Sequence, residues 1–343
     1  MRRAPASKRM VRILRKITLG AVFLLALGKA ADIAAPEPQV GHWRNERARG
    51  DYLSSYRAVL SGIDAPTHTR DIPTEFGTAR ATIWQGPEGS GNPVLLVPGR
   101  ASGAPMWAEN LPSWIGTRTI VALDPIGDAG LSTQSTPFAG PEDQGRWISQ
   151  AVHALDLGPV HVVGHSFGGA TATEFALADP GQVTSLALLE PVMVARPMPP
   201  SIYFWAAIAS LPTPQAWRDR AFAEIGGTTV QEVQTRTPMS EMISSASRAY
   251  SPALPLPRTL SDEQWRNLGM PLRLDIGASS SIAGGEGSIS RINALIPTAT
   301  TVLWPEATHS LPMDERDRIG EELNLFWEKS ERSEGAPPDK GVD

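Results

Sequence analysis

The sequence predicts an α/β protein with a doubly wound, mostly parallel sheet, and two observations carry this prediction. Short apolar runs without polar alternation recur along the chain, as expected of strands that are buried on both faces; they are Val94–Val97, Thr119–Leu123, Val160–Val163, Leu186–Leu189, Leu272–Ile276 and Thr301–Trp304. Helical patterns lie between or after these runs, at residues 146–155, 168–180 and 316–330. Strand and helix therefore alternate, which is the pattern of a parallel sheet covered by helices.

The segments around these runs complete the predicted architecture. Residues 69–89 alternate and turn like two antiparallel strands, so that Leu186–Leu189 becomes the sixth strand. Residues 192 to about 262 then hold short helical pieces, many prolines and no strand pattern. An insertion at this point emerges at the carboxyl ends of the strands, where such folds bind their ligands. We predict that it is a helical cap; the alternative is a surface excursion without function.

The composition narrows the classes of function. With 343 residues, 41% of them hydrophobic and 20% charged, the chain can bury a sizeable core. The net charge of -5 and the absence of a Lys/Arg stripe in the body of the chain argue against a nucleic-acid partner. The chain has no cysteine, which excludes disulfides, thiolate metal sites and a cysteine nucleophile.

The two ends of the chain differ from its body. Seven Lys/Arg precede the apolar run Ile17–Gly28, which at 12 residues falls short of the roughly 20 that a spanning helix needs. Small residues near Gly28 and Ala30 suit a cleavage site, so we predict that residues 1–35 are an export signal, or else an uncleaved membrane anchor. Either one places the domain, residues 36–329, outside the cytoplasm. Residues 330–343 are polar and predict a disordered tail.

Ser166 is the candidate nucleophile. It lies in the stretch VHVVGHSFGGA, directly after an apolar run and before a helix rich in small residues. A sharp turn from strand to helix that exposes a serine oxygen needs small residues two positions to either side, and Gly164 and Gly168 meet this need. We therefore interpret Ser166 as a nucleophile rather than as a helix-capping serine.

With this turn the sequence resembles the α/β-hydrolase superfamily over roughly residues 40–329. It looks most like bacterial serine esterases of that fold in which a D-x-x-G turn follows the preceding strand, here DPIGDAGLS (Asp124–Ser132). The resemblance implies a chain order of nucleophile, acid and histidine. Among six histidines, His309 alone lies in a loop just past the last predicted strand, so we predict that it is the general base.

The resemblance also implies two backbone N–H groups that bind the oxyanion. One belongs to the residue after the nucleophile, Phe167, and the other to the loop VPGRASG, where Arg100 stands in the matching place. Pro98-Gly99 replaces the usual His-Gly in this loop, but the donor is the N–H of Arg100 and stays available. The Arg100 side chain either attracts an acidic substrate group or points to solvent.

The acid departs from the family's pattern. The family usually places it shortly after the seventh strand, and the matching residue here is Ser280, which cannot stabilise an imidazolium by charge. The superfamily's second location is the carboxyl end of the sixth strand, which Glu190 occupies. Neighbouring strands lie about 4.8 Å apart, so a carboxylate there can reach the same imidazole. We predict Glu190 as the acid; Asp275 and Glu286 are the alternatives.

These residues together predict a serine hydrolase that cleaves a carboxylic ester or related acyl compound through an acyl-enzyme, with neither a cofactor nor a metal ion. Serine instead of aspartate at the elbow argues against epoxide hydrolases and haloalkane dehalogenases. A serine-dependent amidase, lactonase or acyltransferase stays open, as does a non-catalytic binding protein, which Ser280 motivates. Met193, Phe204 and Trp205 suggest a small-molecule substrate with an apolar acyl part. Membrane association through residues 1–35 is also open.

Overall fold

The computed structural model describes residues 39–211, 213–235, 237–279 and 281–334. The chain divides into two units, Met1–Gln39 and Val40–Asp343, and the following description concerns the second. The predicted leader, residues 1–35, lies outside the described residues. Within the described part, no helix is both long and apolar enough to span a bilayer.

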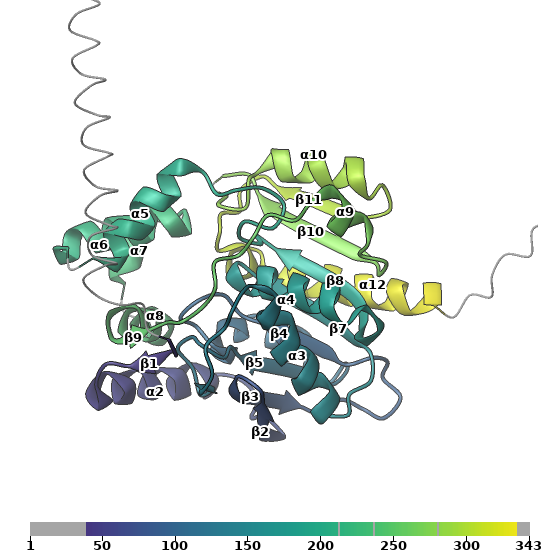
Figure 1. Cartoon of the computed structure of the whole chain (residues 1–343), viewed down its shortest axis with the longest axis horizontal. Helices are drawn as coiled ribbons and strands as arrows, with labels where there is room; N and C mark the ends of the chain where they lie inside the picture. The colour runs from purple at the N-terminus through teal and green to yellow at the C-terminus, as the bar shows by residue number, and fades with distance from the viewer. Residues whose placement is uncertain (1–38, 212, 236, 280, 335–343) are drawn as a thin grey trace, which may run out of the picture. The chain divides into compact units, whose positions relative to one another are not determined.

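One large sheet forms the centre of the fold, and its strand order is β11-β10-β8-β7-β4-β5-β3-β2 (Figure 1). Its parallel strands are β4 (Val94–Val97), β5 (Ile120–Asp124), β7 (Val160–His165), β8 (Val183–Leu189), β10 (Leu272–Gly277) and β11 (Thr300–Trp304). Three antiparallel strands complete it: β2 (His68–Thr74), β3 (Gly77–Trp84) and the short β6 (Thr133–Gln134). All six apolar runs are strands, so the predicted doubly wound sheet is confirmed.

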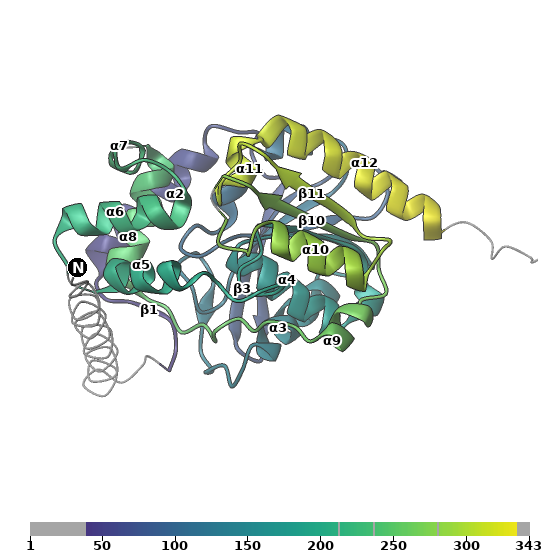
Figure 2. The ribbon, with the colours of Figure 1, turned by 90° about the horizontal axis from the view of Figure 1, so that it is seen from above.

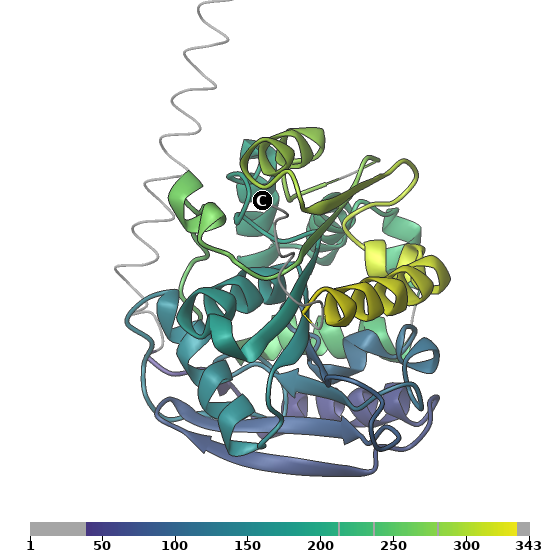
Figure 3. The same cartoon turned by 90° about the vertical axis from the view of Figure 1, so that its right-hand side faces the viewer.

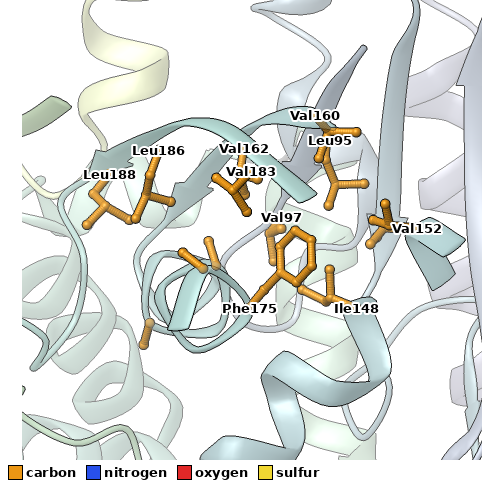
Figure 4. Close-up of a cluster of buried hydrophobic side chains, with 14 of the residues drawn as sticks. Leu95, Val97, Ile148, Val152, Val160, Val162, Phe175, Val183, Leu186 and Leu188 are labelled. Carbon is orange, nitrogen blue, oxygen red and sulfur yellow. The ribbon is translucent and has the colours of Figure 1, made fainter. Parts of the chain in front are cut away.

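Helices cover both faces of the sheet. On one face, α3 (Glu142–Ala154) and α4 (Phe167–Ala178) bury an apolar core with β4, β7 and β8 (Figure 4), which includes Leu95, Ile148, Val162, Phe175 and Leu188. On the other face, α12 (Arg316–Glu334) packs on a cluster that includes Trp107, Trp114, Trp304 and Trp327. Figure 3 shows the two helical layers on opposite sides of the sheet. Burial on both faces explains why these strands are uniformly apolar.

The remaining helices lie around this sheet. Their bounds are α2 (Glu46–Leu60), α9 (Asp262–Arg266), α10 (Glu286–Leu295) and α11 (Leu311–Asp314), with single 3₁₀ turns at Ala104–Trp107, Leu111–Ser113 and Pro180–Gln182. The helix α12 continues to Glu334, which corrects the predicted start of the tail at residue 330. The end of the helix is held by residues far away in the sequence, because Glu331 in its last turns accepts hydrogen bonds from Arg118 (2.8 Å) and from the backbone of Asn92 (2.9 Å).

The segment of residues 192–262, here called the cap segment, is helical and follows β8, the sixth long strand of the large sheet. It contains α5 (Pro200–Ser210), α6 (Gln215–Gly226), α7 (Val230–Gln234), α8 (Pro238–Ala249) and β9 (Tyr250–Ser251). These helices lie at the end of the sheet toward which β8 points (Figure 1). The strand β9 pairs with β1 (His42–Trp43), and α8 packs with α2 against Ala129 in the loop after β5. The cap segment therefore contacts loops at the carboxyl ends of the strands.

Candidate active site

Ser166 lies in the turn between β7 and α4, with φ 55° and ψ -121°. A Cβ at Gly164 would lie 2.6 Å from the Gly168 carbonyl oxygen, and a Cβ at Gly168 would lie 2.2 Å from that of Val97. Neither position can hold a side chain without moving the backbone. The turn is fixed further because the Ser166 N–H donates to the Leu189 carbonyl (3.1 Å). The side chain of Ser166 is thus held in a strained, partly exposed position, as expected of a nucleophile elbow.

The structure brings Ser166, His309 and Glu190 together from three separate segments. His309 lies in the loop between β11 and α11, and its Nε2 is 2.9 Å from Ser166 Oγ. Its Nδ1 is 3.1 Å from Glu190 Oε2. With the proton on Nδ1, the imidazole donates to the carboxylate and accepts from the hydroxyl, which is the arrangement that lets it take the serine proton.

Glu190 directly follows β8 and is fully buried, with φ 48°. Its second carboxylate oxygen, Oε1, accepts a hydrogen bond from the Gly277 N–H at the end of β10 (2.8 Å). A Cβ on Gly277 would lie 2.6 Å from the Ala307 carbonyl oxygen, so glycine lets the loop that carries His309 approach this strand. The carboxylate therefore has a partner on each oxygen, which satisfies its charge in a buried place.

The alternative acids lie elsewhere. Asp275 is buried, but its carboxylate accepts from the Arg273 guanidinium (2.7 Å) and from Trp304 Nε1 (2.8 Å) rather than from His309. Glu286 is exposed in the first turn of α10. Ser280 lies outside the described residues.

The two predicted oxyanion donors lie side by side. The Arg100 guanidinium is 6.0 Å above the Phe167 ring, and a Cβ at the neighbouring Gly99 would lie 3.3 Å from the Ser166 Cβ. Neither the Arg100 N–H nor the Phe167 N–H has an acceptor among the described residues. The Arg100 side chain is exposed. Two free N–H groups next to the serine can bind a developing negative charge.

Two aspartates that the sequence analysis did not assign hold the loop of Arg100 in place. Asp128 accepts from the N–H of Ala101, whose φ is 62°, at 2.8 Å. Asp124 accepts from the N–H groups of Ala104 (2.7 Å) and Leu131 (2.6 Å), and burial raises its pKa. Both aspartates lie in the segment DPIGDAGLS, so the D-x-x-G turn was the sequence feature that could have identified them.

His165, next to the serine, is a further residue whose contact the sequence did not reveal. Its Nε2 donates to the backbone carbonyl of His309 (2.9 Å), and the two imidazole rings are 5.0 Å apart. Burial, with a smaller contribution from the charge of His309, lowers the pKa of His165 to about 3. A neutral His165 thus ties the elbow to the loop that carries His309.

The other histidines do not approach Ser166. His161 is buried within β7, where it contacts Ser185 and Glu331, and His153 contacts Asp179. His68 lies in β2 and His42 in β1. In the described part of the chain, no group of three or more His, Asp or Glu side chains is arranged to hold a metal ion.

Comparisons with known proteins agree with this fold. A family model described as the alpha/beta hydrolase fold matches residues 92–230. The uncharacterized carboxylesterase nap of Bacillus subtilis (strain 168) is 25% identical over 281 residues, which are 80% of this chain and 92% of that protein.

Solved structures extend the likeness over the same length. The naproxen esterase (carboxylesterase NP) of Bacillus subtilis matches with a TM-score of 0.73 at 22% identity, covering 81% of this chain and 97% of the other. The carboxylesterase CesB of Bacillus subtilis matches with a TM-score of 0.72 at 20% identity, covering 82% and 98%. The family match and these relatives show that the chain has the α/β-hydrolase fold and is similar to bacterial carboxylesterases.

Proposed function

We propose that this chain is a serine hydrolase that cleaves carboxylic esters through an acyl-enzyme intermediate. The observation that carries the proposal is a chain of two hydrogen bonds, one between Ser166 Oγ and His309 Nε2 (2.9 Å) and one between His309 Nδ1 and the Glu190 carboxylate (3.1 Å). The names of the similar proteins, which are carboxylesterases, support ester over amide substrates.

The first half of the reaction forms the acyl-enzyme. Ser166 Oγ attacks the ester carbonyl carbon while His309 Nε2 takes the hydroxyl proton. The Glu190 carboxylate stabilises the imidazolium that results. The N–H groups of Arg100 and Phe167 donate to the carbonyl oxygen as it gains negative charge. When the tetrahedral intermediate collapses, the carbon–oxygen bond breaks and His309 returns the proton to the leaving alcohol.

The second half releases the acid. Water gives a proton to His309 and attacks the acyl carbon, the same two N–H groups stabilise the oxyanion, and the proton returns to Ser166 Oγ. The products are one carboxylic acid and one alcohol, and the enzyme is regenerated. No step needs a group from outside the chain other than the ester and water.

The substrate is proposed to be a small ester with an apolar acyl part. Met193 and Trp205 are half-buried and are compatible with this role, whereas Phe204 is 48% exposed. The alternative of a non-catalytic binding protein depended on Ser280 as the residue in the acid position. A Glu190 carboxylate within hydrogen-bond distance of His309 supports the catalytic function over this alternative.

A serine-reactive fluorophosphonate probe and a series of p-nitrophenyl esters of increasing acyl length test the proposal. We expect the probe to label the folded protein at Ser166 and the wild type to hydrolyse at least the short esters. Ser166→Ala is the control, and it should lose both labelling and turnover. Absence of Ser166-dependent labelling in the folded protein would contradict the proposal.

A further inference from the structure

The helix α5 of the cap segment is apolar on all sides. Its eleven residues, PSIYFWAAIAS, contain no charged side chain. One side is packed: Ile202 and Ile208 are buried, and Ile202 clusters with Val192 and with Ile282 from the loop after β10. A helix that is apolar all round is normally covered on all sides.

The opposite side of α5 is exposed. At 100° per residue, Tyr203, Phe204, Ala207 and the terminating Leu211 fall within an arc of about 100°, and we call these four residues the α5 face. Tyr203 is 46% exposed, Phe204 48% and Leu211 42%. The helix α6 packs against α5, and its Trp217 is 60% exposed. An apolar strip with Trp and Tyr beside it is typical of a surface that contacts lipid at the membrane interface.

We propose that the α5 face rests on a lipid bilayer. The choice of occupant comes from the chain that precedes the domain, in which seven Lys/Arg are followed by the apolar run Ile17–Gly28. Such a run inserts into membranes, and its cations favour an anionic surface. This inference is independent of the catalytic proposal.

The place where the chain enters the domain supports the same occupant. The entering strand β1 pairs with β9, which ends the helical part of the cap segment, and the Arg44 N–H donates to the Ala249 carbonyl (2.8 Å). The 14 residues from Gly28 to His42 reach at most about 50 Å when fully extended. A membrane-inserted Ile17–Gly28 run would thus keep the start of the domain, where β1 pairs with the cap segment, within this distance of the bilayer.

The absence of native cysteine allows a direct test on the full-length chain. Phe204→Cys and Leu211→Cys are each labelled with a polarity-sensitive fluorophore and mixed with vesicles of phosphatidylcholine that contain about a quarter phosphatidylglycerol. Leu325→Cys is the matched control, because Leu325 is 62% exposed on α12, which lies at the other end of the domain from α5 (Figure 2). We expect a shift of the emission to shorter wavelength at positions 204 and 211, and none at 325.

A double variant, Phe204→Ser with Leu211→Ser, tests the same surface without a label. We expect its vesicle partition coefficient to fall about tenfold, since two large apolar side chains no longer enter the interface; its melting temperature checks that it is folded. The proposal is overturned if the protein floats with vesicles while no probe shifts, or if it does not bind them. It is equally overturned if position 325 shifts too, or if the shift appears without lipid and grows with protein concentration, as for a second copy.

Discussion

Two buried histidines of this chain have nearly the same partners, yet only His309 belongs to the proposed active site. His309 lies 3.1 Å from the Glu190 carboxylate and 2.9 Å from a serine hydroxyl. His161 lies 3.0 Å from the Glu331 carboxylate and 2.8 Å from another serine hydroxyl. The first site is at the carboxyl end of the sheet and the second near its amino end. Three residue types at the right distances are therefore not sufficient to make a catalytic site.

The surroundings distinguish the two sites. Ser185, the partner of His161, lies inside β8 and is fully buried, so no ester can reach it. Ser166 stands in a turn with positive φ beside two N–H groups that are free among the described residues. Glu331 is also bound by Arg118 and by the backbone of Asn92, which ties α12 to the sheet. Backbone geometry and access to solvent therefore distinguish the Ser–His–Glu group that can act on a substrate from the one that cannot.

Removing each serine tests this comparison with the largest expected effect. Ser166→Ala should lower kcat/KM for a p-nitrophenyl ester on the order of 10⁴-fold or more, because the nucleophile is lost. Ser185→Ala should keep the rate and lower the free energy of unfolding by about 1 kcal/mol, the usual value of one hydrogen bond. Steady-state kinetics and urea unfolding measure both, and equal rate losses in the two variants would refute the distinction.

Replacing the glutamate of each site tests the same comparison with the next largest effect. Glu190→Gln should lower kcat by about 10²- to 10⁴-fold, because an amide cannot stabilise the imidazolium by charge. Glu331→Gln should leave kcat unchanged and lower the free energy of unfolding by about 1–3 kcal/mol, since it weakens the bonds to Arg118 and His161. A Glu190→Gln enzyme with full, Ser166-dependent activity would show that another residue is the acid.

A change at Asp128, which holds the loop of Arg100, should have a smaller effect on the rate. One Asp128 oxygen accepts from the Ala101 N–H and the other from the Ala129 N–H, and in an amide one of these oxygens is replaced by an NH₂ group that cannot accept. Asp128→Asn should therefore displace the oxyanion donor and lower kcat about tenfold to 100-fold with little change in KM. Asp71→Asn, on the exposed strand β2, is the control and should leave both constants unchanged. A change in KM alone would mean that the loop binds substrate without stabilising the oxyanion.

The smallest expected effect concerns His161, whose protonation should make the free energy of unfolding depend on pH. Burial, opposed by the hydrogen bond to Glu331, lowers the pKa of His161 from 6.5 to about 4. Between these values the unfolded chain binds a proton that the folded chain does not, so stability falls as the pH falls. From pH 7 to pH 5, wild type should lose about 2 kcal/mol more than His161→Gln. Urea unfolding at both pH values measures this, and equal losses would argue that His161 titrates normally.

Most of the sheet could be predicted because its strands are buried on both faces and so appear as uniform apolar runs. Ser166 stands out by its two flanking glycines, and His309 by its place after the last strand. Glu190 required more, because its assignment rested on the superfamily's second location for the acid and on the spacing of neighbouring strands.

The contacts that were missed join residues far apart in the sequence. The bond from His165 to the His309 carbonyl spans 144 residues, and that from Arg118 to Glu331 spans 213. The pairing of β1 with β9 involves only two residues on each strand, too few to show a period. Local sequence patterns carry no information on such pairs, because tertiary packing alone brings them together.

The position of Glu190 also affects which part of the enzyme is free to vary. The proposed nucleophile and acid follow neighbouring strands, β7 and β8, and the sequence between Gly277 and Glu286 contains no Asp or Glu. Among the described residues at that end of β10, the Gly277 N–H donates to the Glu190 carboxylate. The Ser279 N–H donates to the Ala307 carbonyl (3.1 Å) in the loop that carries His309, so a protein engineer would reshape this edge of the enzyme beyond Ser279, where the proposed proton-transfer chain is left in place.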